Sequence, residues 1–173
     1  MRSEWEVLDR LLTEARQDER IRAVYMNGSR VNPNARRDIL QDYDVVFVVT
    51  ELAPYLEPRW IDRFGEILLL QEPDRMDALL GLARDFSKRY VYLMQFADGV
   101  RIDLTLELPR LARADFGTDS LTRVLLDKDG LLPPLPPPSE ASFSRPRPRR
   151  SFSTAATTSS GGSCPMWPRP CGA

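Results

Sequence analysis

The sequence predicts an α/β (α+β) protein in which one folded domain is followed by a disordered C-terminal tail. Three observations lead to this prediction. An N-terminal stretch has apolar residues at helical spacing. Several later segments are short and are either apolar throughout or alternate between apolar and polar residues. The composition changes abruptly after residue 132. A chain of 173 residues is long enough for one domain with a buried core. We therefore expect a folded domain over residues 1–132 and a tail over residues 133–173.

The N-terminal segment has the pattern of an amphipathic helix. Ser3, followed three residues later by Glu6, is a capping-box signature. Apolar residues then recur at helical spacing to about residue 17, namely Trp5, Leu8, Leu11, Leu12 and Ala15. After a polar break, residues 21–26 are typical of a first strand, which ends at Asn27-Gly28-Ser29-Arg30 before a polar loop over residues 31–39.

The next segment joins two acids to a very apolar strand. Residues 45–49 are β-branched or aromatic, which predicts a strand buried on both faces. Asp42 and Asp44 precede it two residues apart, so their carboxylates leave one face roughly 6–7 Å apart at the backbone. Unpaired, they repel each other, and a divalent cation such as magnesium removes the conflict. The alternative is a solvated turn or a helix cap, which is common for Asp-x-Asp.

The rest of the predicted domain alternates between short helices and strands. We expect helices over residues 57–64 and 77–88, strands over 67–70, 90–96, 100–108 and 121–126, and a hairpin turn over 97–99. In the segment 100–108, three apolar side chains face one way, while Arg101, Asp103, Thr105 and Glu107 face the other. Asp103 is the third candidate acid, and we expect Glu107 to be an exposed edge residue rather than a catalytic base.

Composition excludes several classes of function. The formal charge of −1 gives no general attraction to nucleic acid or to an anionic membrane. The chain has no histidine, so catalysis has to rest on carboxylates, hydroxyls, Lys, Arg or a bound ion. Cys164 and Cys171 both lie in the tail, so we expect no disulfide framework in the domain. Neither a signal peptide nor a stretch that could span a membrane is evident, and we expect a soluble cytoplasmic protein.

Gly28 and Ser29 complete the candidate site. Gly28 permits a tight turn with close backbone approach, and Ser29 supplies a hydroxyl at a strand end, where free backbone N–H groups can hold a phosphate. Carboxylates that converge on one or two magnesium ions beside such a turn are suited to a nucleoside triphosphate. The order of strand, Gly-Ser and Asp-x-Asp therefore favours phosphate chemistry over unrelated turns.

Five motifs in this chain resemble those of the nucleotidyltransferase superfamily, and in particular the aminoglycoside 6-adenylyltransferases, also called streptomycin adenylyltransferases. The resemblance covers residues 1–143. The motifs are Asp18-Glu19-Arg20-Ile21-Arg22, Gly28-Ser29-Arg30, Gln41-Asp42-Tyr43-Asp44, Arg101-Ile102-Asp103-Leu104-Thr105-Leu106 and Leu126-Asp127-Lys128-Asp129-Gly130.

This resemblance implies a nucleotidyltransferase-like mixed β-sheet flanked by helices, and transfer of AMP from magnesium-bound ATP to the 6-hydroxyl of streptomycin or a similar aminoglycoside. It implies that Asp42, Asp44 and Asp103 are the catalytic metal ligands, and that Gly28 and Ser29 contact the nucleotide phosphates. Arg30 either contacts the triphosphate or forms a salt bridge at the surface.

The tail departs from the family, which continues into a helical, antibiotic-binding domain that opens near an Asn-Glu-Phe-Trp-Trp stretch. Residues 133–173 hold ten of the fifteen prolines, five arginines and a single acid. Codons permitted for Ser159-Ser160-Gly161-Gly162-Ser163 encode Glu-Phe-Trp-Trp-Val when read one nucleotide earlier. We hypothesise a frameshift near Ser144 that left a remnant of the second domain, and the coding DNA tests this. The alternative is an ordinary disordered extension.

Three hypotheses of function follow. The first is an aminoglycoside adenylyltransferase whose activity is impaired by loss of the second domain. The second is a minimal nucleotidyltransferase module that modifies a protein within a toxin–antitoxin type of complex. The third is an inactive remnant that exposes an apolar interface.

Overall fold

The computed structural model describes residues 1–36, 38, 41–82, 86–117 and 121–135. The strands are β1 (Ile21–Asn27), β2 (Tyr43–Val49), β3 (Ile67–Gln71), β4 (Arg89–Phe96), β5 (Arg101–Glu107) and β6 (Thr122–Asp127). The helices are α1 (Glu4–Gln17), α2 (Pro73–Leu79) and α3 (Pro109–Asp115), with two short 3-10 helices, η1 (Ala53–Tyr55) and η2 (Trp60–Phe64).

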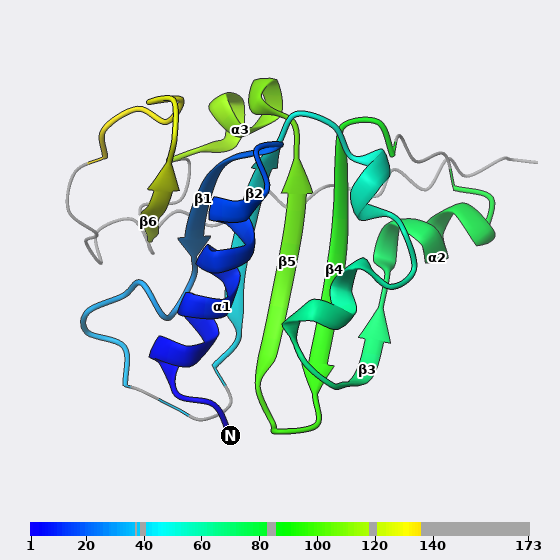
Figure 1. Ribbon diagram of the computed structural model, residues 1–173, viewed down its shortest axis with the longest axis horizontal. Helices are drawn as coiled ribbons and strands as arrows, with labels where there is room; N and C mark the ends of the chain where they lie inside the picture. The colour runs from blue at the N-terminus through cyan, green and yellow to red at the C-terminus, as the bar shows by residue number, and fades with distance from the viewer. Residues whose placement is uncertain (37, 39–40, 83–85, 118–120, 136–173) are drawn as a thin grey trace, which may run out of the picture.

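The strands form one mixed sheet in the order β3-β4-β5-β2-β1-β6 (Figure 1). β2 and β5 are parallel, whereas the other neighbouring pairs are antiparallel. The predicted mixed sheet flanked by helices is therefore confirmed. This topology brings β2 and β5, which are distant in the sequence, side by side at the centre, so that Asp44 and Asp103 become register partners.

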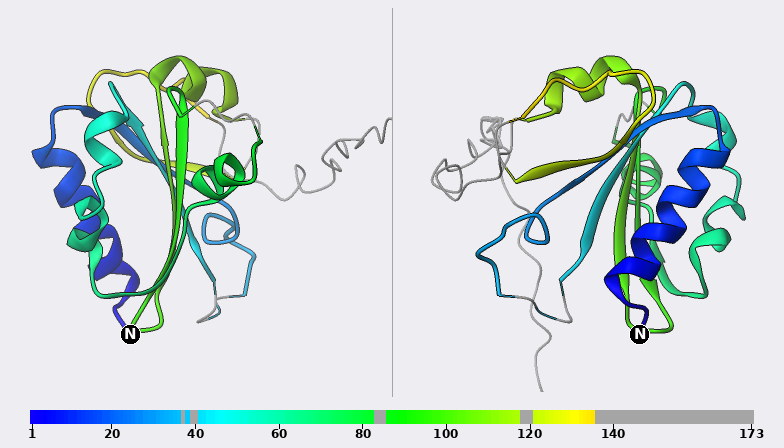
Figure 2. Two further views of the ribbon diagram at one scale, coloured as in Figure 1. Left: turned by 90° about the vertical axis from the view of Figure 1, so that its right-hand side faces the viewer. Right: turned by 60° about the vertical axis from the view of Figure 1, so that its left-hand side comes forward.

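One face of the sheet carries the main core. α1 and the two 3-10 helices cover this face (Figure 2), and the buried α1 residues are Val7, Leu11 and Ala15. The predicted capping box at Ser3 is present, since Ser3 and Glu6 each accept a hydrogen bond from the other's backbone N–H. Trp5 was predicted to share the apolar side of this helix, but it is 72% exposed, because the buried residues recur four apart from Val7.

The opposite face is divided into two parts. Near the carboxyl ends of β2 and β5, Ala112 of α3 and Phe116 pack against Tyr25, Val46 and Val48 in a second, smaller core. Leu132 joins this core, and Leu131 and Leu135 pack against it. The remaining part of this face, near the start of β2 and β5, carries the candidate site.

The predicted strands are confirmed with small changes at their ends, whereas the helices differ more. The helix predicted over residues 77–88 is α2, which begins at Pro73 and ends at Leu79. Proline suits the first helical turn, and the positive φ of Gly81 ends the helix. Part of the predicted range, residues 83–85, lies outside the described residues. The predicted helix over 57–64 is reduced to η2, and α3 was not predicted.

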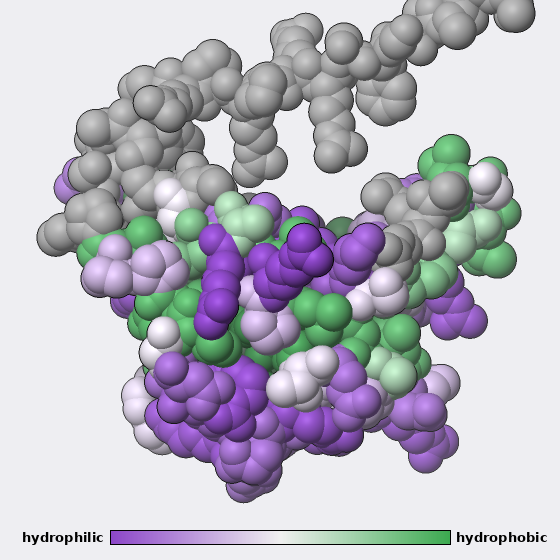
Figure 3. Space-filling model, turned by 90° about the horizontal axis from the view of Figure 1, so that it is seen from above, coloured by the Kyte–Doolittle hydropathy of each residue, from purple (hydrophilic) through white to green (hydrophobic). Residues whose placement is uncertain are grey.

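β3 and α2 form an exposed apolar margin of the molecule. β3 is an edge strand of the sheet, and α2 follows it directly. In Figure 3, apolar residues gather on the projecting part at the right, where Figure 1 shows α2. The exposed large apolar side chains in this region are Leu68, Leu69, Leu70, Met76, Leu79, Leu80 and Leu82.

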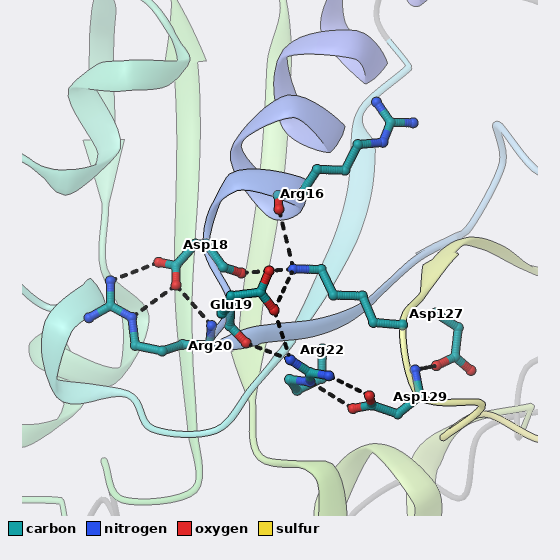
Figure 4. Close-up of polar contacts among 8 residues, drawn as sticks. Arg16, Asp18, Glu19, Arg20, Arg22, Asp127 and Asp129 are labelled. Carbon is teal, nitrogen blue, oxygen red and sulfur yellow. Dashed lines mark hydrogen bonds and ion pairs between the residues drawn. The ribbon is translucent and has the colours of Figure 1, made fainter.

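A cluster of charged residues lies at the start of β1, where two of the resembling motifs meet (Figure 4). Lys128 Nζ donates to the carbonyl oxygen of Asp18 at 3.1 Å, and so satisfies a group just beyond the carboxyl end of α1. Arg22 forms an ion pair with Asp129, and Arg20 Nη2 lies 2.8 Å from Asp18 Oδ2. We call this group, with Glu19, the charge cluster.

Candidate active site

A row of side chains crosses the open part of the sheet at one level. Register pairs link five neighbouring strands at this level, through Leu93 of β4, Asp103 of β5, Asp44 of β2, Asn27 of β1 and Thr122 of β6. Partners in register point to the same face, so Asp44 and Asp103 lie next to each other on neighbouring parallel strands. The structure therefore brings together two of the three predicted acids, from segments well separated in the sequence.

Asp42 joins them through Arg101. Arg101 Nε lies 3.4 Å from Asp42 Oδ2 and donates to Asp103 Oδ1 at 3.1 Å. Its Nη2 donates to Asp103 Oδ2 at 3.2 Å. One guanidinium thus bridges two of the predicted acids. We call Asp42, Asp44 and Asp103 the acidic site.

The electrostatics of the acidic site show an excess of negative charge. Burial raises the pKa of Asp42 above its ordinary value, and the charge of Asp103 adds to this, against the opposing effect of Arg101. The hydrogen bond to Asp103 raises the pKa of Arg101, which is also raised by the charges of all three acids. All three acids therefore act on one cation, and Asp42 is harder to ionise than in free solution.

Gly28 lies in direct contact with the acidic site. Its φ is +81°, and a Cβ at this position would lie 2.3 Å from Asp44 Oδ2. The backbone at the end of β1 therefore passes close to the Asp44 carboxylate, so that a side chain at position 28 would be strained by the positive φ and would require this carboxylate to move. Ser29 is exposed in the turn that follows, and its carbonyl oxygen accepts from the N–H of Asn32.

Arg30 is held on the other side of the strand from Asp44. Its guanidinium stacks on the Tyr43 ring, 3.7 Å from the ring centroid, and donates to the carbonyl oxygens of Gln41 and Asp42. Tyr43 belongs to the main core, whereas Asp44 faces the opposite side. Arg30 and Tyr43 also line a cavity of about 240 Å³. Arg30 Nη1 also lies 3.8 Å from Glu4 Oε2, so the salt bridge predicted as one alternative is present. Its contact with a triphosphate stays a prediction, and its hydrogen bonds anchor the backbone that carries Asp42.

Two polar residues of the row were not predicted as site residues. Thr122 Oγ1 lies 2.8 Å from Asn27 Oδ1, and Asn27 is the register partner of Asp44. Asn27 precedes Gly28 at the end of a strand, which is a signal that the sequence carries. Thr122 has no such signal, because only the pairing of β6 with β1 brings it to this level.

The prediction for Glu107 was wrong. Glu107 is fully buried near the end of a central strand rather than exposed at an edge. Tyr25 donates its hydroxyl proton to Glu107 Oε1 at 2.6 Å, and Arg89 Nη2 donates to Glu107 Oε2 at 2.6 Å. Arg89 Nη2 also donates to Asp115 of α3 at 2.5 Å. The alternation within the strand was predicted correctly, but the sequence does not show that α3 covers this end of the polar face.

The acidic site suits a divalent cation in donor type and charge. Within the described residues, no three potential ligands gather around a single point in the way a closed metal centre requires. Magnesium, however, is usually held by one or two carboxylates together with water and phosphate oxygens. Arg101 already fills the role of a cation between Asp42 and Asp103. The residues present therefore fit magnesium if the Arg101 guanidinium moves away from Asp42 and Asp103.

Comparisons with known proteins identify the family of this chain. A sequence profile described as streptomycin adenylyltransferase matches residues 1–156. The chain belongs to the streptomycin adenylyltransferase family. It is 41% identical to an aminoglycoside 6-adenylyltransferase from Campylobacter jejuni over 86% of this chain and 51% of the relative. It is 36% identical to one from Staphylococcus aureus over 76% of this chain and 46% of the relative.

A solved structure of the family supports the fold. The crystal structure of an aminoglycoside 6-adenyltransferase from Bacillus subtilis matches with a TM-score of 0.60 and 32% identity, over 78% of this chain and 44% of that one. This chain thus spans about half the length of the family members it matches. None of the helices in the described part of the chain is long and apolar enough to cross a membrane. The predicted boundary at residue 132 and the frameshift remain predictions.

Proposed function

We propose that this chain is the nucleotide-binding half of an aminoglycoside 6-adenylyltransferase, which transfers AMP from ATP to the 6-hydroxyl of streptomycin. The single observation that carries the proposal is the acidic site itself. Asp44 and Asp103 are register partners, Asp42 is linked to Asp103 by Arg101, and Gly28 lies against Asp44. This arrangement concentrates negative charge beside the end of β1, where the Gly28 backbone lies against Asp44.

Each site residue has a separate part in the proposed reaction. Asp42, Asp44 and Asp103 would hold magnesium, which when bound neutralises the triphosphate and polarises the α-phosphate. Gly28 lets the backbone at the end of β1 lie against the Asp44 carboxylate, and the exposed Ser29 would offer a hydroxyl to a phosphate there. Arg30 fixes the backbone of residues 41 and 42 through their carbonyl oxygens, and so keeps Asp42 in place.

The reaction is an in-line displacement at phosphorus. The 6-hydroxyl oxygen of the drug forms a bond to the α-phosphorus, and the bond from this phosphorus to the oxygen that leads to the β-phosphate breaks. Pyrophosphate leaves with the bonding electron pair, and the hydroxyl proton passes to water. Positioning and charge neutralisation supply most of the rate enhancement in reactions of this kind. Because the co-substrate is ATP, we place the reaction in the cytoplasm.

Calorimetric titration with Mg–ATP tests the nucleotide site. We expect Asp42→Asn to weaken binding by about a hundredfold, because it removes one anionic ligand from the site. Asp129→Asn is the matched control, since it makes the same chemical change in the charge cluster and should leave binding within about twofold. Equal affinities of the wild type and Asp42→Asn would overturn the proposal.

A transfer assay with radiolabelled ATP distinguishes the alternatives. Since the chain spans about half the length of its relatives, we expect Mg–ATP to bind but little AMP to reach streptomycin. Turnover at the rate of a full-length relative would contradict the expected impairment. Label on a co-purified protein instead of the drug would favour a protein-modifying module. A chain that neither melts cooperatively nor binds Mg–ATP would favour an inactive remnant.

A further inference from the structure

Arg101 occupies an unusual place for a surface arginine. It begins β5, two residues before Asp103, and its guanidinium contacts both Asp103 and Asp42. The contacts to Asp103 are a two-point interaction through Nε and Nη2, which is stronger and more directional than a single ion pair. The side chain is nevertheless 44% exposed, so solvent and ligands can reach it.

The bridging guanidinium does the same electrostatic work as a metal ion. Neighbouring carboxylates repel each other unless a positive charge lies between them. Arg101 supplies that charge to Asp42 and Asp103, and the charge of Asp44 also stabilises its cationic form. A divalent cation bound by the same oxygens would compete with Arg101, because the two positive charges repel at short distance and require the same ligands.

We propose that Arg101 is a resident counter-ion of the acidic site, which leaves Asp42 and Asp103 when a metal–triphosphate complex binds and then faces the phosphates. This inference rests on the proposed function, because it requires the acidic site to take a metal-bound nucleotide. Once displaced, the guanidinium stays tethered beside the site by its strand position. It then contributes a positive charge next to the anionic triphosphate, where planar donors pair well with phosphate oxygens.

The proposal predicts opposite effects of one substitution on two ligands. Arg101→Ala removes the competitor, so the protein should bind Mn²⁺ alone about tenfold more tightly than the wild type, measured from the electron paramagnetic resonance signal of free Mn²⁺. The same variant should bind Mg–ATP about tenfold more weakly by calorimetry, because the phosphates lose a cationic partner. A purely structural role for Arg101 would weaken the binding of both ligands together.

Two further variants control for charge and folding. Arg123→Ala removes one positive charge from a side chain that is also 44% exposed and lies 4.0 Å from Glu4. The register partner of Arg123 is Met26, which belongs to the main core on the opposite face of the sheet from Asp44. This variant should bind both ligands as the wild type does. Arg101→Lys keeps the charge and should bind Mn²⁺ within about threefold of the wild type. If Arg101→Ala fails to melt cooperatively, Arg101→Gln gives the same test, since an uncharged amide cannot compete as a cation.

The outcomes separate this inference from the proposed function. If Arg101→Ala binds Mn²⁺ no more tightly than the wild type, while Asp42→Asn loses Mn²⁺, the acidic site stands and the role of Arg101 is refuted. If neither the wild type nor any Arg101 variant binds Mn²⁺ or Mg–ATP, both the acidic site and the inference are refuted. Tighter Mn²⁺ binding together with weaker Mg–ATP binding in Arg101→Ala supports both.

Discussion

Aspartates belong to both the acidic site and the charge cluster, but the two groups differ in their electrostatic balance. In the charge cluster, Asp18 accepts from the backbone and side chain of Arg20, and these hydrogen bonds lower its pKa to about 2. In the acidic site, burial raises the pKa of Asp42, and Arg101 only partly offsets this. The charges of the charge cluster neutralise one another, whereas the acidic site keeps more negative than positive charge.

This difference shows how to separate structural from functional charges in one small domain. Asp127, next to the charge cluster, accepts from the backbone N–H groups of Leu131, Leu132 and Asp129 and closes a loop. These hydrogen bonds lower its pKa against the opposing effect of burial. Acids with lowered pKa values stabilise the fold, whereas an acid whose pKa is raised is retained at a cost to stability. On this criterion, Asp42 is a candidate for function and Asp18 for stability.

The two glycines next to these regions give the largest expected difference. Gly28 and Gly130 both have positive φ, but a Cβ at Gly28 would lie 2.3 Å from Asp44 Oδ2, while a Cβ at Gly130 meets nothing within 4 Å. We expect Gly28→Ala to weaken Mg–ATP binding by more than about a hundredfold, because the Asp44 carboxylate has to move. Gly130→Ala should destabilise folding by about 1–2 kcal/mol from backbone strain alone and leave binding unchanged.

Calorimetry and chemical denaturation of both glycine variants check this prediction. Similar losses of Mg–ATP affinity in Gly28→Ala and Gly130→Ala would show that strain, rather than contact with Asp44, is responsible. The proposed difference between Gly28 and Gly130 would then be contradicted.

The same substitution in each region should change stability in different directions. Asp18→Asn should lower the free energy of unfolding by about 1–2 kcal/mol, after allowance for screening at the exposed Arg20, because it removes a charged acceptor. Asp42→Asn should leave the free energy of unfolding equal to or above that of the wild type, because it removes the desolvation cost of a partly buried carboxylate and, secondarily, its repulsion by Asp103. Urea denaturation at pH 7 measures both values, and a larger loss for Asp42→Asn would contradict the assignment.

The pH dependence is the smallest effect and the sharpest test of the two pKa directions. The pKa of Asp18 is lowered to about 2 from 3.8, so its stabilisation is present above about pH 4 and is lost as the pH falls toward 2. The pKa of Asp42 is raised above its ordinary value of 3.8, so its penalty is absent in acid, grows as the pH rises from about 4 toward the folded pKa, and is complete above that. The stability difference between the wild type and Asp18→Asn should therefore shrink between pH 4 and pH 2.

The same measurements on Asp42→Asn provide the contrast. Its stability difference from the wild type should vanish below about pH 4, where the wild-type carboxyl is protonated in both the folded and the unfolded protein. Any advantage of Asp42→Asn that grows as the pH falls would mean that the pKa of Asp42 is lowered rather than raised.

The sequence was most informative where local patterns and burial agree. The capping box at Ser3, the apolar strand that follows Asp44 and the alternation around Asp103 were all predicted and are present in the structure. Trp5 and Glu107 were placed wrongly for one reason. Helical spacing and strand alternation define faces, but they do not say which neighbour covers each face.

By itself, the sequence determined the strands, the N-terminal helix, the mixed composition of helix and strand, and the choice of three candidate acids, because these depend on side-chain periodicity and on spacing along the chain. Only the tertiary structure decided that Asp44 and Asp103 become neighbours, that Arg101 bridges Asp42 and Asp103, and that Glu107 is buried under α3. The parallel pairing of β2 with β5 joins segments far apart in the chain, and local patterns carry no information about such pairing.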